Sequence, residues 1–483
     1  MRLFTFFLFF IFASFQITAQ TVELNPENPH YLNYKNQPVI LITSAEHYGA
    51  VLNLDFDYET YLKTLGDEGM NYTRIFTGVY VEEPGAFNIK NNTLAPKPNR
   101  VITPWKRSGT PGYANGGNKF DLDQWDEQYF NRLKDFLKTA EANNVIVEIT
   151  FFSSIYRESG WEISPLHPEN NVNGINHKDY KTVHTPDNGK KADYQQKMVS
   201  KIVKEVNEFD NIFFEIQNEP WSDQKATGYY INPFDKKSDQ DWKRRVDLAS
   251  EASLEWQKNI AAVVKETEST LPKKHIIAQN FCNFKYPLKE VEPNISIINF
   301  HYAWPDAVNW NYGYNKVLSY DESGFSGSED DVYRKQAWNF IMSGGGIFNN
   351  LDYSFFAGKE DGSMVNEAPG GGSKNLRKEL KVLKDFIGSF EFIRLKPDHT
   401  TIKFAPGVIA KTLSEPGKQY AIYLELGNSC ELQLELPKGK YSTDWVNVTS
   451  GVIIKNEVLE SRGKVVRLKS PEYEGAIALR IKK

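Results

Sequence analysis

Two glutamates stand in short motifs whose residue types suit acid–base chemistry. Glu219 lies in the segment IQNEP, and Glu322 lies in the segment SYDESG. Cleavage of a glycosidic bond needs one carboxylic acid that protonates the leaving oxygen and one carboxylate opposite it. At a separation of about 5 Å the carboxylate acts as a nucleophile and the sugar configuration is retained. Asn218, beside Glu219, carries an amide suited to binding a sugar 2-hydroxyl, a contact that strengthens in the transition state.

Eight short runs rich in Ile, Val and Phe have the composition of strands buried on both faces. They are 38–43, 71–77, 145–152, 211–217, 275–280, 296–301, 316–320 and 346–353. Helical periodicity fills most of the gaps, at 58–69, 125–143, 193–209, 241–267, 330–342 and 374–386. The alternation predicts an α/β fold, a closed (β/α)8 TIM barrel over residues 20–395. An open doubly wound sheet is the alternative, but it would ordinarily show a glycine-rich phosphate turn, which this sequence lacks.

A barrel would bring the two glutamates to one rim. Glu219 directly follows the fourth predicted strand and Glu322 ends the seventh, so both would face across the mouth of the barrel. Asp321 is the rival of Glu322 as the reactive carboxylate. Because neighbours in a strand face opposite ways, only one of them is expected to point into the site, and Gly324 two residues on favours Glu322.

Three segments resemble a known family of enzymes. IQNEP, NFHYAWP and SYDESGF, in that order and on those strands, resemble the clan A retaining glycoside hydrolases, and most of all the cellulase-like barrels of family 5. The resemblance covers the predicted barrel. It implies that Glu219 is the acid/base and Glu322 the nucleophile. It also implies that Arg74, in NYTRIF, orients the nucleophile and that His301 and Tyr302 line the site.

Further residues are candidates for contact with a substrate. Aromatic rings stack on the apolar faces of sugars, and four tryptophans fall in loops after predicted strands: Trp161, Trp221, Trp304 and Trp310. We expect Trp221 and Trp304 to bind substrate because they stand nearest the motif residues, with loop packing as the alternative. Glu46 and His47, after the first strand, would either contact sugar hydroxyls or form a structural pair.

The eighth strand departs from the family 5 pattern, which usually places a tryptophan at its end. It reads GIFNNLDYSF, and we expect Asn350 to contact the substrate there. The departure leaves the sugar preference open. Inside the barrel, Glu148 on the third strand is expected to pair with Arg74 as a structural residue. The tryptophans that fall within helical patterns are expected in the core: Trp125, Trp242, Trp256 and Trp338.

Metal ligands and cofactor motifs are not indicated. His167, His177 and His184 share a polar loop but lack a metal-binding spacing such as H-E-x-x-H. Two cysteines, Cys282 and Cys430, provide neither a disulfide framework nor a cysteine metal site. The sequence therefore predicts no metal and no cofactor.

From residue 396 the pattern changes to short strands separated by turn residues. They are 402–404, 408–412, 419–426, 431–436, 441–447, 464–468 and 476–481. Such spacing predicts a small all-β sandwich over residues 396–483. The segment resembles the sandwiches that follow the barrel in many bacterial glycosidases, which implies a structural appendage docked on the barrel.

The N-terminus has the layout of a secretory signal peptide over residues 1–19. Arg2 precedes an apolar run at 3–15, and Ala19 precedes the expected cleavage point. A membrane anchor, the alternative, needs about 20 apolar residues. We therefore expect export from the cytoplasm to the periplasm, the cell surface or the medium. With 57 Lys+Arg against 62 Asp+Glu, the chain has no basic footprint for nucleic acid.

The leading hypothesis is a secreted retaining glycoside hydrolase that cleaves β-linked polysaccharides or oligosaccharides through a covalent glycosyl-enzyme. A carbohydrate-binding protein without catalysis, built on a glycosidase barrel, is the alternative suggested by the eighth strand. An esterase would need a G-x-S-x-G nucleophile elbow, and none occurs in the chain.

Overall fold

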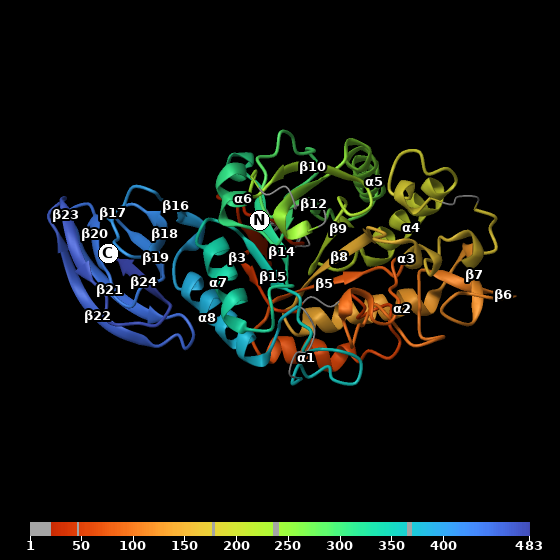
Figure 1. Ribbon diagram of the computed structural model, residues 1–483, viewed down its shortest axis with the longest axis horizontal. Helices are drawn as coiled ribbons and strands as arrows, with labels where there is room; N and C mark the ends of the chain where they lie inside the picture. The colour runs from red at the N-terminus through yellow and green to blue at the C-terminus, as the bar shows by residue number, and fades with distance from the viewer. Residues whose placement is uncertain (1–20, 46–47, 176–178, 235–240, 365–369) are drawn as a thin grey trace, which may run out of the picture.

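The computed structural model describes residues 21–45, 48–175, 179–234, 241–364 and 370–483. Figure 1 shows two regions, a large α/β region and, in blue, an all-β region formed by the end of the chain. The predicted signal peptide, together with Glu46, His47 and His177, lies outside the described residues. Among the residues described, no helix combines the length and apolar character needed to cross a membrane.

Within the described residues, eight parallel strands form a nearly closed barrel, as predicted. They are β4 (Leu41–Ile42), β5 (Tyr72–Phe76), β8 (Ile146–Ser153), β9 (Ile212–Asn218), β12 (Ile277–Asn283), β13 (Ile297–His301), β14 (Val317–Ser323) and β15 (Ile347–Asn350). Their order is β4-β15-β14-β13-β12-β9-β8-β5, so β4 and β5 meet at the seam. Asn71 bridges this seam. Its side-chain amide donates to the carbonyl of Ile40 at 2.9 Å and accepts from the amide of Ile42 at 3.1 Å.

Amphipathic helices surround the strands. They are α1 (Tyr58–Asp67), α2 (Glu127–Ala142), α3 (Glu158–Glu162), α4 (Lys191–Val206), α5 (Glu251–Ser269), α6 (Pro305–Asn311), α7 (Asp330–Ile341) and α8 (Lys374–Gly388). In α2 the predicted apolar stripe faces inward, and Phe136 and Leu137 are fully buried. Asp126 caps this helix by accepting a hydrogen bond from the amide of Gln128 at 2.9 Å.

The helix predicted at 241–267 begins later than the sequence pattern suggested. The antiparallel strands β10 (Lys225–Tyr230) and β11 (Arg245–Ala249) form a hairpin, and α5 starts only at Glu251. Ser250 caps α5 by accepting from the amide of Ser253 at 3.2 Å. Trp242 was predicted as a helix core residue, which is wrong. It lies in a short 3-10 turn (Trp242–Arg244) and is only partly buried.

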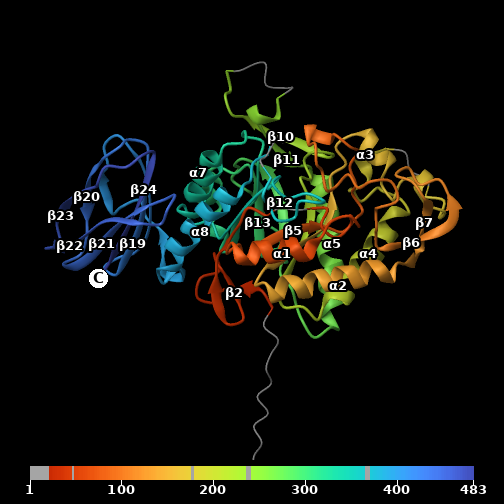
Figure 2. The same ribbon diagram turned by 90° about the horizontal axis from the view of Figure 1, so that it is seen from below.

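One end of the barrel is covered by an additional three-stranded sheet. The strands β1 (Glu23–Leu24), β2 (Leu32–Tyr34) and β3 (Gln37–Val39) form it. Val22 and Leu32 pack there against Leu41, Tyr72 and Ile146 at the starts of barrel strands. In Figure 2 this sheet lies below the barrel, and the β10–β11 hairpin stands at the opposite end. The carboxyl ends of the strands are therefore the end that carries long loops, including the hairpin β6 (Trp105–Pro111) and β7 (Asn118–Trp125).

The end of the chain forms the predicted all-β region. Its strands are β16 (Lys396–Pro397), β17 (Ile402–Phe404), β18 (Ile409–Glu415), β19 (Gln419–Glu425), β20 (Glu431–Glu435), β21 (Gly439–Asn447), β22 (Ile453–Ser461), β23 (Val465–Lys469) and β24 (Ala476–Lys482). One sheet has the order β16-β18-β19-β24-β21-β22 and the other β17-β20-β23. Tyr423 on β19 stacks on Trp338 of α7 with ring centroids 5.2 Å apart, so the larger sheet packs on the barrel helices.

Candidate active site

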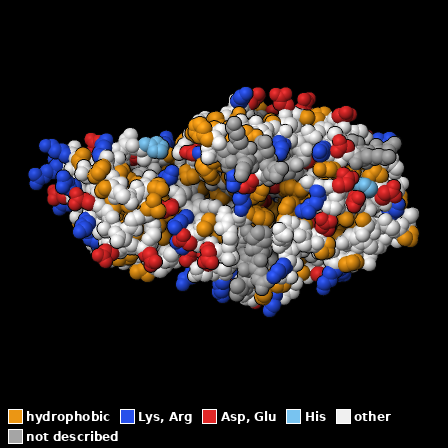
Figure 3. All heavy atoms as spheres, viewed as in Figure 1, with side chains coloured by type: hydrophobic (Ala, Val, Ile, Leu, Met, Phe, Trp, Pro, Cys, Tyr) orange, Lys and Arg blue, Asp and Glu red, His pale blue; other side chains and the backbone are white. Residues whose placement is uncertain are grey.

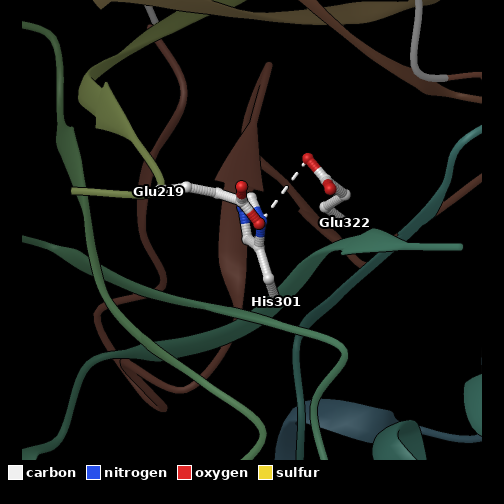
Figure 4. Close-up of side chains that lie close together, drawn as sticks. All are labelled: Glu219, His301 and Glu322. Atoms are coloured by element: carbon white, nitrogen blue, oxygen red, sulfur yellow. Dashed lines mark hydrogen bonds and ion pairs between the residues drawn. The ribbon is translucent and has the colours of Figure 1, made fainter. Parts of the chain in front are cut away.

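Glu219 and Glu322 meet at the carboxyl end of the barrel. Carboxylate oxygens of the two residues and a ring nitrogen of His301 lie within 4.8 Å of one another. Figure 4 shows the glutamates approaching from opposite sides, with the His301 ring against Glu219 and facing Glu322. Only 8% of Glu219 and 4% of Glu322 is exposed. A pair of carboxyl groups about 5 Å apart has the spacing at which one carboxylate can attack a sugar directly.

Glu219 is held by its backbone and by a tyrosine. Its φ of 47° lies in the left-handed region, which costs a residue other than glycine roughly 1–3 kcal/mol and occurs where the surrounding structure fixes it. The hydroxyl of Ser154 donates to the Glu219 carbonyl at 2.6 Å. The hydroxyl of Tyr156 donates to the carboxylate at 2.8 Å. The turn directs the side chain into the mouth of the barrel directly after β9.

Glu322 is surrounded by donors and positive charge. The hydroxyl of Tyr302 donates to Oε1 at 2.5 Å, and the hydroxyl of Tyr48 donates to Oε2. Nη1 of Arg74 lies 3.6 Å from Oε2. Burial works against ionisation of Glu322, but the charge and hydrogen bond of His301, with Arg74 and Tyr302, outweigh it and lower its pKa to about 2. Glu322 is therefore ionised over the physiological range.

His301 links the two carboxylates. Its Nδ1 lies 3.1 Å from Glu219 and 3.4 Å from Glu322, and its Nε2 lies 3.4 Å from Asp321. Burial lowers the pKa of this histidine, but the charges of Glu322 and Asp321, together with hydrogen bonds to Asp321 and Glu219, raise it well above its ordinary value. The ring also packs edge-on against Trp221, with centroids 5.5 Å apart. His301 thus supplies a positive charge between the two glutamates.

Arg74 anchors the site from below. Its Nε donates to Glu215 at 3.0 Å, and its Nη2 donates to the side-chain oxygen of Asn218 at 2.8 Å. Glu148 lies farther away, with an oxygen 3.9 Å from Nε, so the expected pair with Arg74 is present but is not its shortest contact. This geometry fixes both the Asn218 amide and, through Nη1, the position of Glu322.

Asp321 faces the barrel interior together with Glu322, although neighbours in a regular strand would alternate. The reason is a bulge. Tyr320 pairs with Phe300 and Glu322 pairs with His301, so Asp321 is left without a partner in the register. Asp321 is fully buried beneath the site, and Glu322 lines the cavity. Glu322, and not Asp321, is thus among the residues that line the cavity, although the alternation that was expected to separate them is broken by the bulge.

Two groups of described residues could bring ligand atoms to a cation. One is the Glu219, His301 and Glu322 set, and the other is Glu148, Glu215 and Asp321, whose oxygens lie within 4.8 Å of one another. Arg74 already contributes its positive charge to the second group, with Nη2 3.5 Å from Asp321. In both groups a positively charged side chain, His301 or Arg74, therefore already stands among the carboxylates and balances the charge that a metal ion would otherwise balance.

The site opens into a cavity of about 480 Å³. Of the predicted residues, Asn218, Glu219, Trp221, Tyr302 and Glu322 line it, while Arg74 and His301 lie behind this wall. Other lining residues were not singled out from the sequence. They include Tyr48, Phe76, Tyr80, Glu82, Tyr156, Trp242, Arg245, Asp247, Asn283 and Tyr353. Position after a barrel strand is the signal that could have found Tyr48 and Tyr156.

Glu82 is the most unusual of these additional residues. It lies in the loop after β5, is 7% exposed and accepts hydrogen bonds from Tyr80 at 2.9 Å and from Asn92. Burial, only partly offset by these bonds, raises its pKa to about 7. A carboxyl group that takes up a proton near neutral pH therefore lines the cavity wall.

Solved structures with the same architecture carry the names of glycoside hydrolases. One, a "Glycoside hydrolase", superposes with a TM-score of 0.61 at 11% identity over 96% of this chain and 97% of its own. Another, a glycoside hydrolase family 5 from Bacteroides vulgatus ATCC 8482, has a TM-score of 0.59 at 12% identity over 96% and 92% of the two chains. At such identities the likeness establishes a shared fold. No protein-family model matches the sequence, and no curated protein matches it.

The remaining predicted residues lie elsewhere. Asn350 is fully buried, accepts from Ser323 at 2.6 Å and donates to Ser44 at 3.1 Å, so its amide is engaged between strands and does not line the cavity. Trp304 lies at the surface beside the cavity, in an adjoining groove. The other two loop tryptophans line neither space. Trp161 is fully buried, and Trp310 is 46% exposed.

Proposed function

We propose that this protein is an exported retaining glycoside hydrolase that cleaves β-glycosidic bonds in a polysaccharide or oligosaccharide. One observation carries the proposal. Glu219 and Glu322 have carboxylate oxygens within 4.8 Å of each other across a cavity, and donors and cations surround Glu322. This is the separation used by enzymes that form a covalent glycosyl-enzyme, and it is too short for an inverting pair with a water between them.

In the first proposed step, Glu322 attacks the anomeric carbon of the sugar. The bond to the leaving oxygen breaks as Glu219 delivers its proton to that oxygen, which leaves Glu219 as a carboxylate and the sugar as an ester of Glu322. Tyr302 and Arg74 keep Glu322 ionised and aimed before the attack. As the ester forms, the negative charge of Glu322 is lost while that of Glu219 appears, so His301 remains beside one carboxylate throughout.

In the second proposed step, Glu219 removes a proton from water, and the water oxygen attacks the anomeric carbon. The ester bond to Glu322 breaks, and both glutamates return to their initial states with the β configuration retained. Asn218 would bind the 2-hydroxyl of the sugar through its amide nitrogen, which otherwise donates to the Tyr156 hydroxyl at 2.9 Å. The proposed steps use the two carboxyl groups and water, without a metal or cofactor.

Two further lines support the proposal. The structural neighbours reported above are named glycoside hydrolases, and one is named as family 5. The N-terminal sequence has a charged residue, an apolar run and a small residue in the order of a signal peptide, which supports export. An exported enzyme meets its substrate outside the cytoplasm. A glycan located there therefore agrees with both the structural neighbours and the N-terminal sequence.

The direct test is release of reducing sugar from a panel of β-linked glucans, mannans, xylans and galactans. We expect the wild type to cleave at least one glycan and Glu322→Gln to lose activity by more than the roughly 10⁴-fold upper range of acid–base effects. Trp310→Ala, a substitution outside the cavity, is the control for activity that is lost merely by preparing a variant protein. Equal activity of the wild type and Glu322→Gln would contradict the assignment of the nucleophile. Tight glycan binding without turnover would favour the carbohydrate-binding alternative.

A further inference from the structure

A second hollow adjoins the cavity and reaches the C-terminal sandwich. This groove has a volume of about 570 Å³. Trp242, Tyr302 and Phe325 line both the groove and the cavity, so the two spaces adjoin at these rings. The far side of the groove is formed by Ile409 and Lys411 of β18 and by Glu425 of β19. The groove therefore joins the carboxylate pair to the sandwich.

A row of aromatic rings follows the groove outward from Glu322. Trp242 lies 4.7 Å from Tyr302, measured between ring centroids, and stacks parallel to Phe284 at 5.9 Å. Phe284 is in turn 6.2 Å from Trp304. Trp304 is 37% exposed, a large fraction for a tryptophan, and Figure 3 shows hydrophobic side chains gathered over α6, which begins directly after it. Phe284 is only 6% exposed and backs the row, whereas the exposed rings, above all Trp304, can each carry one face of a sugar ring.

Polar groups along the groove suit hydroxyl groups better than a charged ligand. Charges of both signs are already paired there, as in Lys335 with Asp331 at 2.6 Å. Asn339 donates to Glu425 at 2.5 Å. Lys411 is different, because within the described residues it makes no ion pair and the charges of Asp306 and Glu425 act on it only through space. Its ammonium group, partly removed from water, offers free donors to a neutral oxygen ligand.

We propose that this groove binds the sugar units of a long substrate that lie beyond the carboxylate pair, so that the C-terminal sandwich takes part in binding glycan chains. This inference rests on the proposed function, since the occupant is the same glycan that Glu322 attacks. Trp304 would supply the outer stacking face, and Lys411 would bind hydroxyl groups from the sandwich side.

The test compares chain lengths. For β-1,4-linked gluco-, manno- and xylo-oligosaccharides of two to six units, kcat/KM is measured with Trp304→Ala and Lys411→Ala. We expect the ratio of kcat/KM for six-unit to two-unit substrates to fall about tenfold in Trp304→Ala and several-fold in Lys411→Ala. Trp310→Ala on α6 and the exposed Lys418→Ala on the sandwich are matched controls that leave the ratio unchanged. A ratio unchanged in Trp304→Ala would overturn the proposal, as would equal losses on short and long substrates.

A binding measurement separates failure of this inference from failure of the proposed function. If no oligosaccharide or polysaccharide of the panel is hydrolysed, affinity electrophoresis in gels containing each polysaccharide is run with the wild type, Glu322→Gln and Trp304→Ala. Retardation of the first two, lost in Trp304→Ala, would support the groove although hydrolysis had failed. Equal mobility of all three in every gel would overturn the groove as a glycan site.

Discussion

The cores of the barrel and of the sandwich differ in what they bury. The barrel encloses ionisable side chains that are fully buried directly beneath the carboxylate pair: Arg74, Glu148, Glu215, His301 and Asp321. The sandwich core is built from apolar and aromatic side chains, among them Ile422, Leu432, Leu434, Trp445 and Leu479. Buried charges are costly unless they are paired and hydrogen-bonded. The difference indicates that the barrel tolerates the free-energy cost of buried charges at the place where these charges position the two glutamates.

The buried charges also imply a buried proton. The side-chain nitrogen of Asn299 lies 2.9 Å from Glu148, 2.9 Å from Glu215 and 3.0 Å from Asp321. Because an amide nitrogen has only two hydrogens, it cannot donate to all three carboxylates at once. Burial and then the charge of Glu215 raise the pKa of Glu148 well above its ordinary value. Burial also raises the pKa of Asp321, but less strongly, so we expect the buried proton on Glu148.

The largest predicted effect is a loss of stability in the sandwich that leaves the activity of the barrel unchanged. Trp445 is fully buried, so Trp445→Ala should lower the free energy of unfolding by about 3–5 kcal/mol. Its distance in the fold from the carboxylate pair predicts no change of kcat/KM on two-unit substrates below the unfolding transition. Urea unfolding and steady-state kinetics check this, with the exposed Trp310→Ala as control. A loss of kcat/KM on short substrates would show that the cores are not independent.

Within the barrel core, a pair of substitutions tests which carboxyl group is charged. Glu215→Gln removes the closest acidic partner of Arg74 and should cost about 3 kcal/mol of unfolding free energy. Glu148→Gln replaces a protonated carboxyl group by a neutral amide and should cost less than about 1 kcal/mol. Both are measured by urea unfolding at pH 7. Equal costs would mean that Glu148 is ionised and that the buried proton lies elsewhere.

A smaller effect is expected on the pH dependence. Tyr302→Phe removes the donor 2.5 Å from Glu322, so the pKa of Glu322 should rise from about 2. The nucleophile must be ionised, so the acidic limb of kcat/KM should move to higher pH by about one unit. The depressed pKa also contributes stability above pH 4.5, which is lost as the pH falls toward 2. Tyr314→Phe is the control, because the Tyr314 hydroxyl donates to the Leu288 carbonyl at 2.8 Å, away from the two glutamates. An acidic limb at the same pH in both variants would contradict the role of Tyr302.

Much of the fold and the centre of the site followed from local patterns. The barrel strands are continuous apolar runs, and such runs indicate directly that both faces of a strand are buried. Glu219 and Glu322 could be paired because parallel strands of a barrel end at one rim. Arg74, His301 and Tyr302 followed only from the resemblance to family 5, and all three lie around Glu322 in the structure.

The parts that could not be predicted depend on tertiary contacts. The hairpin β10–β11 contains Lys, Gly and Tyr residues without a clear alternation of apolar and polar positions. The sequence around Trp242 therefore predicts a helix. The bulge at Asp321 arises from pairing between β13 and β14, which no single strand encodes. The edge strand β22 was missed because charged residues interrupt it and its side chains are largely exposed. Tyr48 and Tyr156 carry no motif. Their position after barrel strands is shared with many other loop residues, and their contacts with the two glutamates distinguish them.

The most direct test of the central claim is the configuration of the first product. A glycan that the wild type cleaves is hydrolysed in deuterated buffer, and the anomeric proton signals are followed by NMR before mutarotation equilibrates them. If Glu322 forms a glycosyl ester across the short separation from Glu219, the β anomer appears first and the α anomer grows in later. If the α anomer appears first, water attacks the sugar directly, and the assignment of Glu322 as a covalent nucleophile is wrong.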